Sequence, residues 1–138
     1  MSRVIKFRGW HETKKIMFGA DQMGKDQLTI SPDGRGFINV SGRNTADSVF
    51  LPYIIPMQFI GQVDKNEKEI YEDDIVQAQI ENPVGEDFIG TAVVEFDDEC
   101  SCFQLNFLEL GQTFAPIIGN MVEIVGNYHE DRYLFKDL

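Results

Sequence analysis

The chain has little of what exported, membrane-spanning or disulfide-stabilised proteins need. Its only cysteines are Cys100 and Cys102, and two cysteines this close on a strand are poorly placed for a disulfide. No apolar run approaches the roughly 18 residues of a membrane helix, and the first residues carry charges where a signal peptide has an apolar stretch. We therefore expect a single domain, residues 1–138, in a reducing cytoplasm and not at a membrane.

Basic residues are missing from a long stretch, since none lies between Lys68 and Arg132. Residues 1–69 carry ten Lys or Arg and eight Asp or Glu, a net charge of +2, whereas residues 70–138 carry two and fifteen, a net charge of −13. Such a surface repels phosphate groups, so direct nucleic-acid binding by the second half is not expected. The carboxylates serve either as a solubilising surface or as a negative surface for a basic partner.

Helical periodicity is also missing, because no run of about 12 residues repeats apolar side chains at helical spacing. Short segments instead alternate apolar and polar residues, as strands do. These segments are residues 5–10, 16–18, 28–30, 36–40, 74–80, 91–96, 103–107 and 122–126. They predict an all-β or β-dominated α+β fold, with N-terminal hairpins in about residues 1–60 and a small barrel or strongly bent sheet in about residues 61–138.

Three other segments lead to local predictions. Residues 49–60 are apolar but contain Pro52 and Pro56, which oppose a regular helix and a central strand, so we expect buried, irregular chain there. Residues 19–26 follow the spacing of a phosphate-binding loop but end in an aspartate where Ser or Thr is required, and we interpret them as a loop between hairpins. Asn127 is a suitable N-cap for one short helix that runs through Phe135.

No pattern of residues in the sequence indicates a catalytic or a cofactor-binding site. Cys100 and Cys102 are half of a metal site at most, because His11 and His129 are distant in sequence and no second pair exists. Residues 64–69 hint at a calcium loop but lack its glycine. Neither histidine has a neighbouring Ser or Cys that would indicate a nucleophile. We therefore assign no catalytic, cofactor-binding or metal-binding residue.

Residues 59–76 read FIGQVDKNEKEIYEDDIV, which resembles the signature of the YopX family, close to YTGLKDKNGKEIYEGDIV. Three further blocks occur in family order. Residues 5–10 resemble the opening IKFRAWD, residues 92–96 resemble GVVEF, and residues 122–130 resemble the closing EVIGNIYE. Two family glycines are replaced, by Glu67 and by Asp73. We expect positive φ angles at both positions, because glycine is favoured where the backbone is left-handed.

The resemblance implies a β-rich fold with a Src-homology-3-like barrel in its later part, an origin in a phage or prophage, and no established activity. The expected location is then the cytoplasm of the bacterial host. Our leading hypothesis is a noncatalytic binding or adaptor module, which rests on fold analogy. One alternative is an acidic inhibitor that mimics nucleic acid in the basic groove of a host enzyme. Another is an enzyme that uses surface carboxylates.

A protein with a basic surface is the partner that the charge distribution favours. Carboxylates that are ionised and unpaired almost never stay buried, so most of the acidic second half is expected on the surface. The residues predicted to contact the partner are Glu72, Asp73, Asp74, Asp97, Asp98 and Glu99. The sequence leaves the oligomeric state open.

Overall fold

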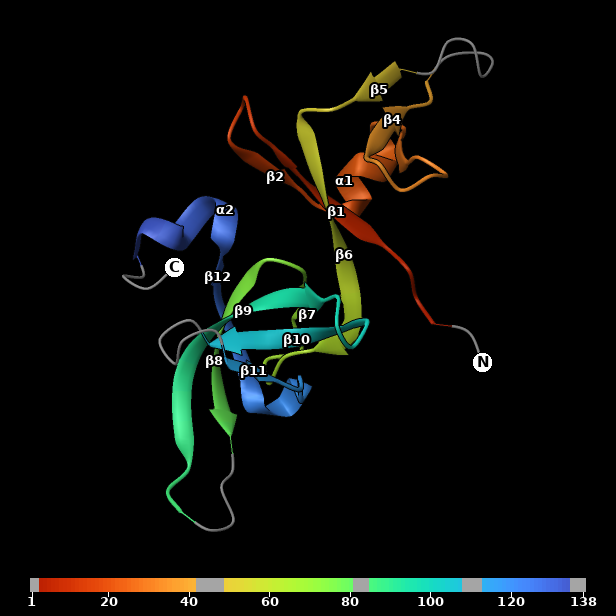
Figure 1. The fold of residues 1–138 in the computed structure, drawn as a ribbon. Coiled ribbons are helices and arrows are strands. Elements are labelled where there is room, and N and C mark those ends of the chain that lie inside the picture. The colour runs from red at the N-terminus through yellow and green to blue at the C-terminus, as the bar shows by residue number, and fades with distance from the viewer. Residues whose placement is uncertain (1–2, 42–48, 81–84, 108–112, 135–138) are drawn as a thin grey trace. The chain divides into compact units, whose positions relative to one another are not determined.

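The computed structural model describes residues 3–41, 49–80, 85–107 and 113–134. The chain divides into two compact units, Met1–Gln58 and Phe59–Leu138, which are called the first and second unit below. The division lies close to residue 60, where the hairpins were predicted to give way to the barrel-like part. Each unit is considered by itself (Figure 1).

Strands dominate both units, which confirms the predicted β-rich fold class. The first unit contains the two predicted hairpins, formed by β1 with β2 and by β3 with β4, and β5 adds a third strand to the second hairpin. The strands of this unit before β6 are β1 (Phe7–His11), β2 (Ile16–Phe18), β3 (Leu28–Ile30), β4 (Phe37–Asn39) and β5 (Val49–Leu51). Four of these five strands have three residues, the short end of the usual range.

Two predictions for the first unit were wrong. The expected loop at residues 19–26 contains a six-residue helix, α1 (Ala20–Lys25), because Met23 is drawn into an apolar cluster with Phe37 and Ile54. The expected irregular chain at residues 49–60 contains β5 and the ten-residue β6 (Ile54–Val63).

The prolines do not prevent β6, although proline cannot donate a backbone hydrogen bond. Pro56 lies opposite Gly9 of β1, and β6 pairs with β7 (Glu69–Tyr71) only from Phe59 onward. Pro56 therefore lies where β6 has only β1 as a described neighbour. Proline is tolerated in such a place because one edge of the strand needs no donor.

The second unit is built on a five-stranded antiparallel sheet with the order β11-β10-β9-β8-β12. The sheet is curled into a half-barrel (Figure 1), as the predicted bent sheet requires. Its strands are β8 (Asp74–Ile80), β9 (Phe88–Asp97), β10 (Cys102–Phe107), β11 (Thr113–Ala115) and β12 (Val122–Asn127). Four of the five correspond to predicted segments.

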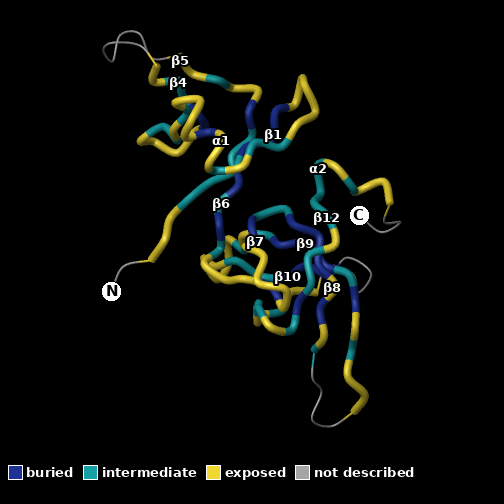
Figure 2. Tube along the Cα trace, turned by 180° about the vertical axis from the view of Figure 1, so that it is seen from behind, coloured by how far each residue is buried: buried dark blue, intermediate teal, exposed yellow. Residues whose placement is uncertain are grey.

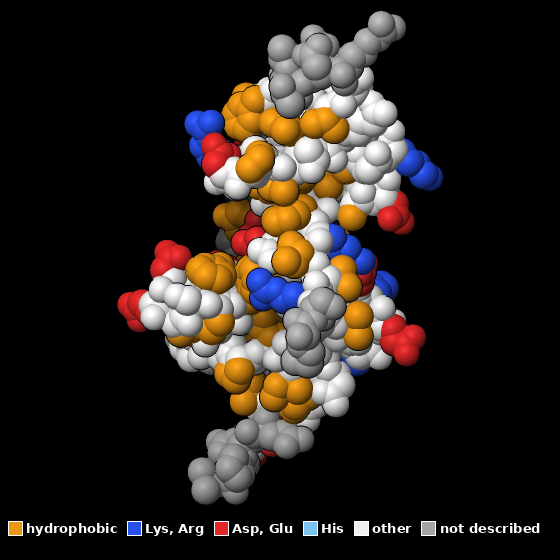
Figure 3. All heavy atoms as spheres, turned by 90° about the vertical axis from the view of Figure 1, so that its right-hand side faces the viewer, with side chains coloured by type: hydrophobic (Ala, Val, Ile, Leu, Met, Phe, Trp, Pro, Cys, Tyr) orange, Lys and Arg blue, Asp and Glu red, His pale blue; other side chains and the backbone are white. Residues whose placement is uncertain are grey.

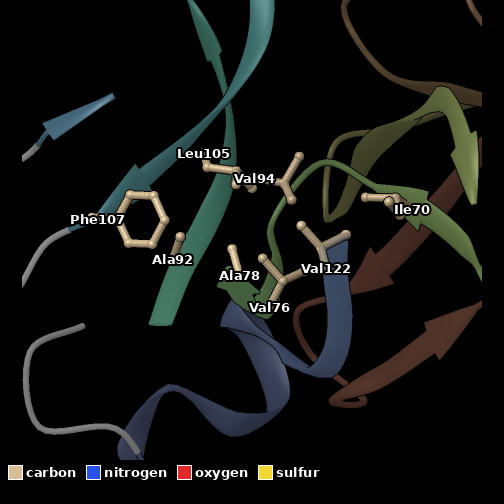
Figure 4. Packing of buried hydrophobic residues seen from close by; sticks show 8 residues of the cluster. All are labelled: Ile70, Val76, Ala78, Ala92, Val94, Leu105, Phe107 and Val122. Atoms are coloured by element: carbon tan, nitrogen blue, oxygen red, sulfur yellow. The ribbon is translucent and has the colours of Figure 1, made fainter. Parts of the chain in front are cut away.

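The main core lies on the concave face of this sheet. Alternate residues of neighbouring strands point into it, such as Val76 and Ala78 of β8 and Ala92 and Val94 of β9 (Figure 4). Figure 2 shows buried positions along β8 and β9. Each large apolar side chain buried in this way contributes about 1.5–3 kcal/mol to folding. The period-two pattern that predicted these strands thus corresponds to one face of each strand turned toward the core.

The helices of the second unit are short. They are η3 (Gly119–Met121), α2 (Tyr128–Asp131) and η4 (Arg132–Leu134). Asn127 caps α2 as predicted, because its side chain accepts hydrogen bonds from the backbone of His129 and Glu130. The predicted end at Phe135 lies outside the described residues. None of the helices that the structure describes is long and apolar enough to cross a membrane.

Positive φ angles occur at both positions where the family has glycine. Glu67 has φ 65° and Asp73 has φ 68°, which confirms the prediction. Trp10 and Tyr71 are buried, at 5% and 7% exposure, so both aromatic side chains serve the fold of their units.

Candidate functional site

The candidate site is the end of the five-stranded sheet where β8 and β10 begin and where β9 and β12 end. The register places Asn127 opposite Asp74, Cys102 opposite Asp97 and Ile75 opposite Val93, so three connections leave the sheet at this end, and β9 runs three residues beyond the start of β8 before its turn. We call the carboxylates of these connections the acidic end. Its members are Glu72, Asp73, Asp97, Asp98, Glu99, Glu130 and Asp131.

Asp73 organises the turn that enters β8. Its backbone N–H donates to the carbonyl oxygen of Val94 at 2.8 Å, and its own carbonyl accepts from the N–H of Tyr128 at 2.7 Å. Its carboxylate contacts Nε2 of His129 at 2.8 Å. Capping by Asn127 starts α2, and the ring of His129 in its first turn reaches Asp73, 56 residues earlier in the sequence. Asp73 is thus half-buried and joins three segments.

Asp74 does not lie on the surface. Its exposure is 2%, and its carboxylate accepts a hydrogen bond from the N–H of Tyr71 at 2.8 Å. The reason is the strand register: Asp74 begins β8 on the same face as Val76 and Ala78, which point into the core. Asp74 is one of the six predicted partner-binding residues, and the prediction that it lies on the surface was wrong. It adds no exposed carboxylate to the acidic end.

Glu72, which precedes Asp73, is half-buried, and the β9–β10 turn presents the remaining three predicted residues. Asp98 and Glu99 are exposed and Asp97 is half-buried, and Oδ1 of Asp97 accepts the N–H of Glu99 at 3.0 Å. Phe96 lies directly before them and is 46% exposed, with its ring against that of Phe103 at a centroid distance of 5.3 Å. Phe96 lies on the core face of β9 but beyond the cluster that fills the half-barrel.

Few described cations balance these carboxylates within the second unit. At the acidic end, the guanidinium group of Arg132 lies over the ring of Tyr128 at 5.3 Å. Elsewhere in the unit, Lys65 pairs with Glu123 at 3.1 Å. Within the part of the chain that the structure describes, Asp97, Asp98 and Glu99 form no ion pair, so the negative charge of the β9–β10 turn has no direct cationic partner there.

Asp64 is a buried acid whose importance the sequence reasoning missed. It is 3% exposed, and its carboxylate accepts three backbone N–H groups, those of Asn66, Lys68 and Ile124, at 2.8–3.0 Å. Burial raises its pKa, but the three hydrogen bonds together outweigh burial, so the pKa lies below its ordinary value. An aspartate that bonds the backbone two residues on is a recognised turn signal, and that signal was present in the sequence.

Neither buried acid lines the apolar cavity of the second unit. This cavity has a volume of about 160 Å³ and lies between β8, β10 and the segment before β12. Its lining includes Ile80, Leu105, Ala115, Ile118, Met121 and Val122. Among the described residues, no group of three His, Cys, Asp or Glu side chains is arranged to hold a metal ion. The hypothesis of catalysis by carboxylates therefore gains no support from this cavity.

Comparisons with known proteins agree with the architecture. The family model "YopX protein" matches residues 6–136. The crystal structure of protein EF1440 from Enterococcus faecalis is similar in fold, with a TM-score of 0.60 and 21% sequence identity, over 98% of this chain and 100% of that chain. The comparison with curated proteins gave no match. Since the family model covers nearly the whole chain, the protein belongs to the YopX family.

Proposed function

We propose that this chain is a noncatalytic binding module that uses the acidic end to bind a protein with a basic surface. The observation that carries the proposal is that three connections, each rich in carboxylates, leave the same end of the sheet. Charges placed in this way attract an oppositely charged partner and raise its association rate at low ionic strength.

An exposed aromatic side chain supports the same proposal. Phe96 is 46% exposed beside Asp97 and Asp98, and aromatic residues are enriched in the centres of protein interfaces. On the face drawn in Figure 3, Asp and Glu side chains lie at several separate places, with apolar side chains and Lys and Arg side chains between them. A partner that covers Phe96 together with Asp97 and Asp98 is expected to meet apolar surface and carboxylates at once, which favours a protein over a simple polycation.

The test begins with identifying a partner from a bacterial lysate by capture on the protein and by mass spectrometry. Association of the purified partner is then compared between the wild-type protein and a variant with Asp97→Asn, Asp98→Asn and Glu99→Gln. We expect the association rate at low salt to fall about tenfold in the variant, and the wild-type rate to fall steeply with salt. Circular dichroism verifies that the variant is folded.

The matched control removes three charges away from the acidic end, with Glu67→Gln, Glu86→Gln and Asp87→Asn. If this control slows association as much as the first variant does, the association rate depends on the net charge of the protein and not on the acidic end. Binding that is insensitive to the first variant and to salt contradicts the proposal. Competition by duplex DNA for the partner would instead support the alternative, a nucleic-acid mimic that occupies a basic groove.

A further inference from the structure

The two cysteines of the chain come together at the β9–β10 turn. Cys100 and Cys102 are both exposed, and their sulfur atoms lie 2.9 Å apart. The sequence reasoning placed both on a strand, where a bridge is sterically poor, but only Cys102 belongs to a strand. Ser101 between them has φ 55°, and this left-handed residue turns the chain so that both side chains reach the same place.

The two sulfur atoms have different hydrogen-bond partners. The Sγ of Cys100 lies 3.2 Å from Oδ2 of Asp97. Its hydrogen bond to Cys102 and the adjacent carboxylate of Asp97 raise the pKa of Cys100 to about 12. A thiol that donates to a carboxylate is held protonated, and only a thiolate is an effective nucleophile, so Cys100 is the poorer first nucleophile of the two.

We propose that Cys100 and Cys102 form a dithiol site for thiol–disulfide exchange with low-molecular-weight disulfides such as glutathione disulfide. The Cys102 thiolate attacks one sulfur of the disulfide, forms a mixed disulfide and expels one thiolate. Cys100 then loses its proton to solvent and attacks the sulfur of Cys102, which releases the second small thiol. The protein loses two hydrogens and forms one S–S bond, while the small disulfide is reduced to two thiols.

The closeness of the two sulfur atoms favours the second step over a stable mixed disulfide, because the resolving thiol is held beside the bond that it attacks. Formation of the Cys100–Cys102 disulfide also removes the thiol proton that faces Asp97 in the reduced protein. Oxidation therefore changes the environment of a carboxylate at the acidic end, although the exchange chemistry does not depend on the proposed binding function.

The full-length protein is reduced, freed of reductant and incubated with excess glutathione disulfide, then quenched with acid, alkylated and weighed by mass spectrometry. We expect a monomer that has lost two hydrogens and carries neither glutathione nor alkyl groups, and that dithiothreitol restores. Cys100→Ser is expected to stop at one bound glutathione, because it keeps the attacking sulfur but lacks the resolving one. A wild-type protein with glutathione on each cysteine, a disulfide-linked dimer, or a wild type that stays fully alkylated while Cys100→Ser binds glutathione would overturn the proposal.

Variants of Ser101 test whether the turn creates the site. Ser101→Gly keeps the positive φ angle and is expected to close at the wild-type rate, whereas Ser101→Val disfavours that angle and is expected to close several-fold more slowly. Equal rates for these two variants would show that the turn does not bring the sulfur atoms together.

Discussion

The two units of the chain differ in charge and in the size of their apolar cores. Residues 1–58 carry eight basic and five acidic residues, a net charge of +3, whereas residues 59–138 carry four and eighteen, a net charge of −14. The buried cluster of the first unit consists of Met23, Phe37 and Ile54, and that of the second unit has eight members drawn from five strands. Self-repulsion destabilises a compact state, so the unit with the larger core is also the one able to tolerate a large excess of one charge.

Truncation of one core phenylalanine in each unit gives the largest expected effect. Phe107→Ala should lower the free energy of unfolding of the second unit by about 3–5 kcal/mol, since the side chain is fully buried. Phe37→Ala should lower the free energy of unfolding of the first unit, where fewer buried residues surround the cavity that the substitution leaves. Hydrogen exchange followed by mass spectrometry of peptides locates the loss of protection. If either substitution removes protection from both units equally, the units are one cooperative structure and the comparison fails.

A second pair of substitutions compares a buried aspartate with an exposed one. Asp64→Asn should cost about 2 kcal/mol, because an amide cannot accept all three backbone N–H groups. Asp33 of the first unit also has a lowered pKa, chiefly through the hydroxyl of Ser31, but it is exposed, and Asp33→Asn should cost clearly less. Urea denaturation at neutral pH measures both.

The lowered pKa of Asp64 predicts a pH dependence of the stability. Because the folded-state pKa of Asp64 is lowered, the unfolded state binds its proton more readily, and the stabilisation is present above the ordinary value of 3.8. It is lost as the pH falls from about 5 through the folded pKa. The difference in stability between the wild type and Asp64→Asn should therefore shrink on acidification. A difference that stays constant down to pH 3 would show that Asp64 acts only through its shape.

The smallest effects are expected at the helix caps. Asn127 caps α2 of the second unit with its side chain, so Asn127→Ala should cost about 1 kcal/mol. Gly19 begins α1 of the first unit without a side-chain cap, and a Cβ there meets no atom within 4 Å. Gly19→Ser should thus stabilise the first unit by a few tenths of a kcal/mol. Thermal melts and hydrogen exchange measure both effects. A Gly19→Ser variant that is less stable than the wild type would show that a serine side chain does not cap α1 at this position.

Local pattern was sufficient where a residue and its immediate neighbours decide the structure. Four strands of the second unit, β8, β9, β10 and β12, followed from alternation, and the cap at Asn127 followed from residue type. The left-handed angles of Glu67 and Asp73 followed from the glycines that the family has at these positions. Pattern was insufficient for α1 and β6. The first depends on burial of Met23, and the second depends on which edge of the strand at Pro56 has a neighbour.

The acidic end shows the same limit. Sequence alone assembled six carboxylates as one surface, but the register of β8 buries Asp74, and a contact across 56 residues joins Asp73 to His129. The sequence could not reveal that Asp64 would accept the N–H of Ile124, a residue 60 positions away. The same holds for Cys100, whose place beside Cys102 depends on the turn at Ser101.

The sequence by itself determined the β-rich class, the family and the charge asymmetry, because alternation, signature residues and ionisable groups are properties of the linear chain. Only the tertiary structure decided which carboxylates are exposed, which of them hold turns together, and which apolar side chains lie beside them. The physical reason is that burial and hydrogen bonding are set by segments distant in sequence. A carboxylate that accepts backbone N–H groups stabilises the fold, whereas an exposed one remains available to a partner.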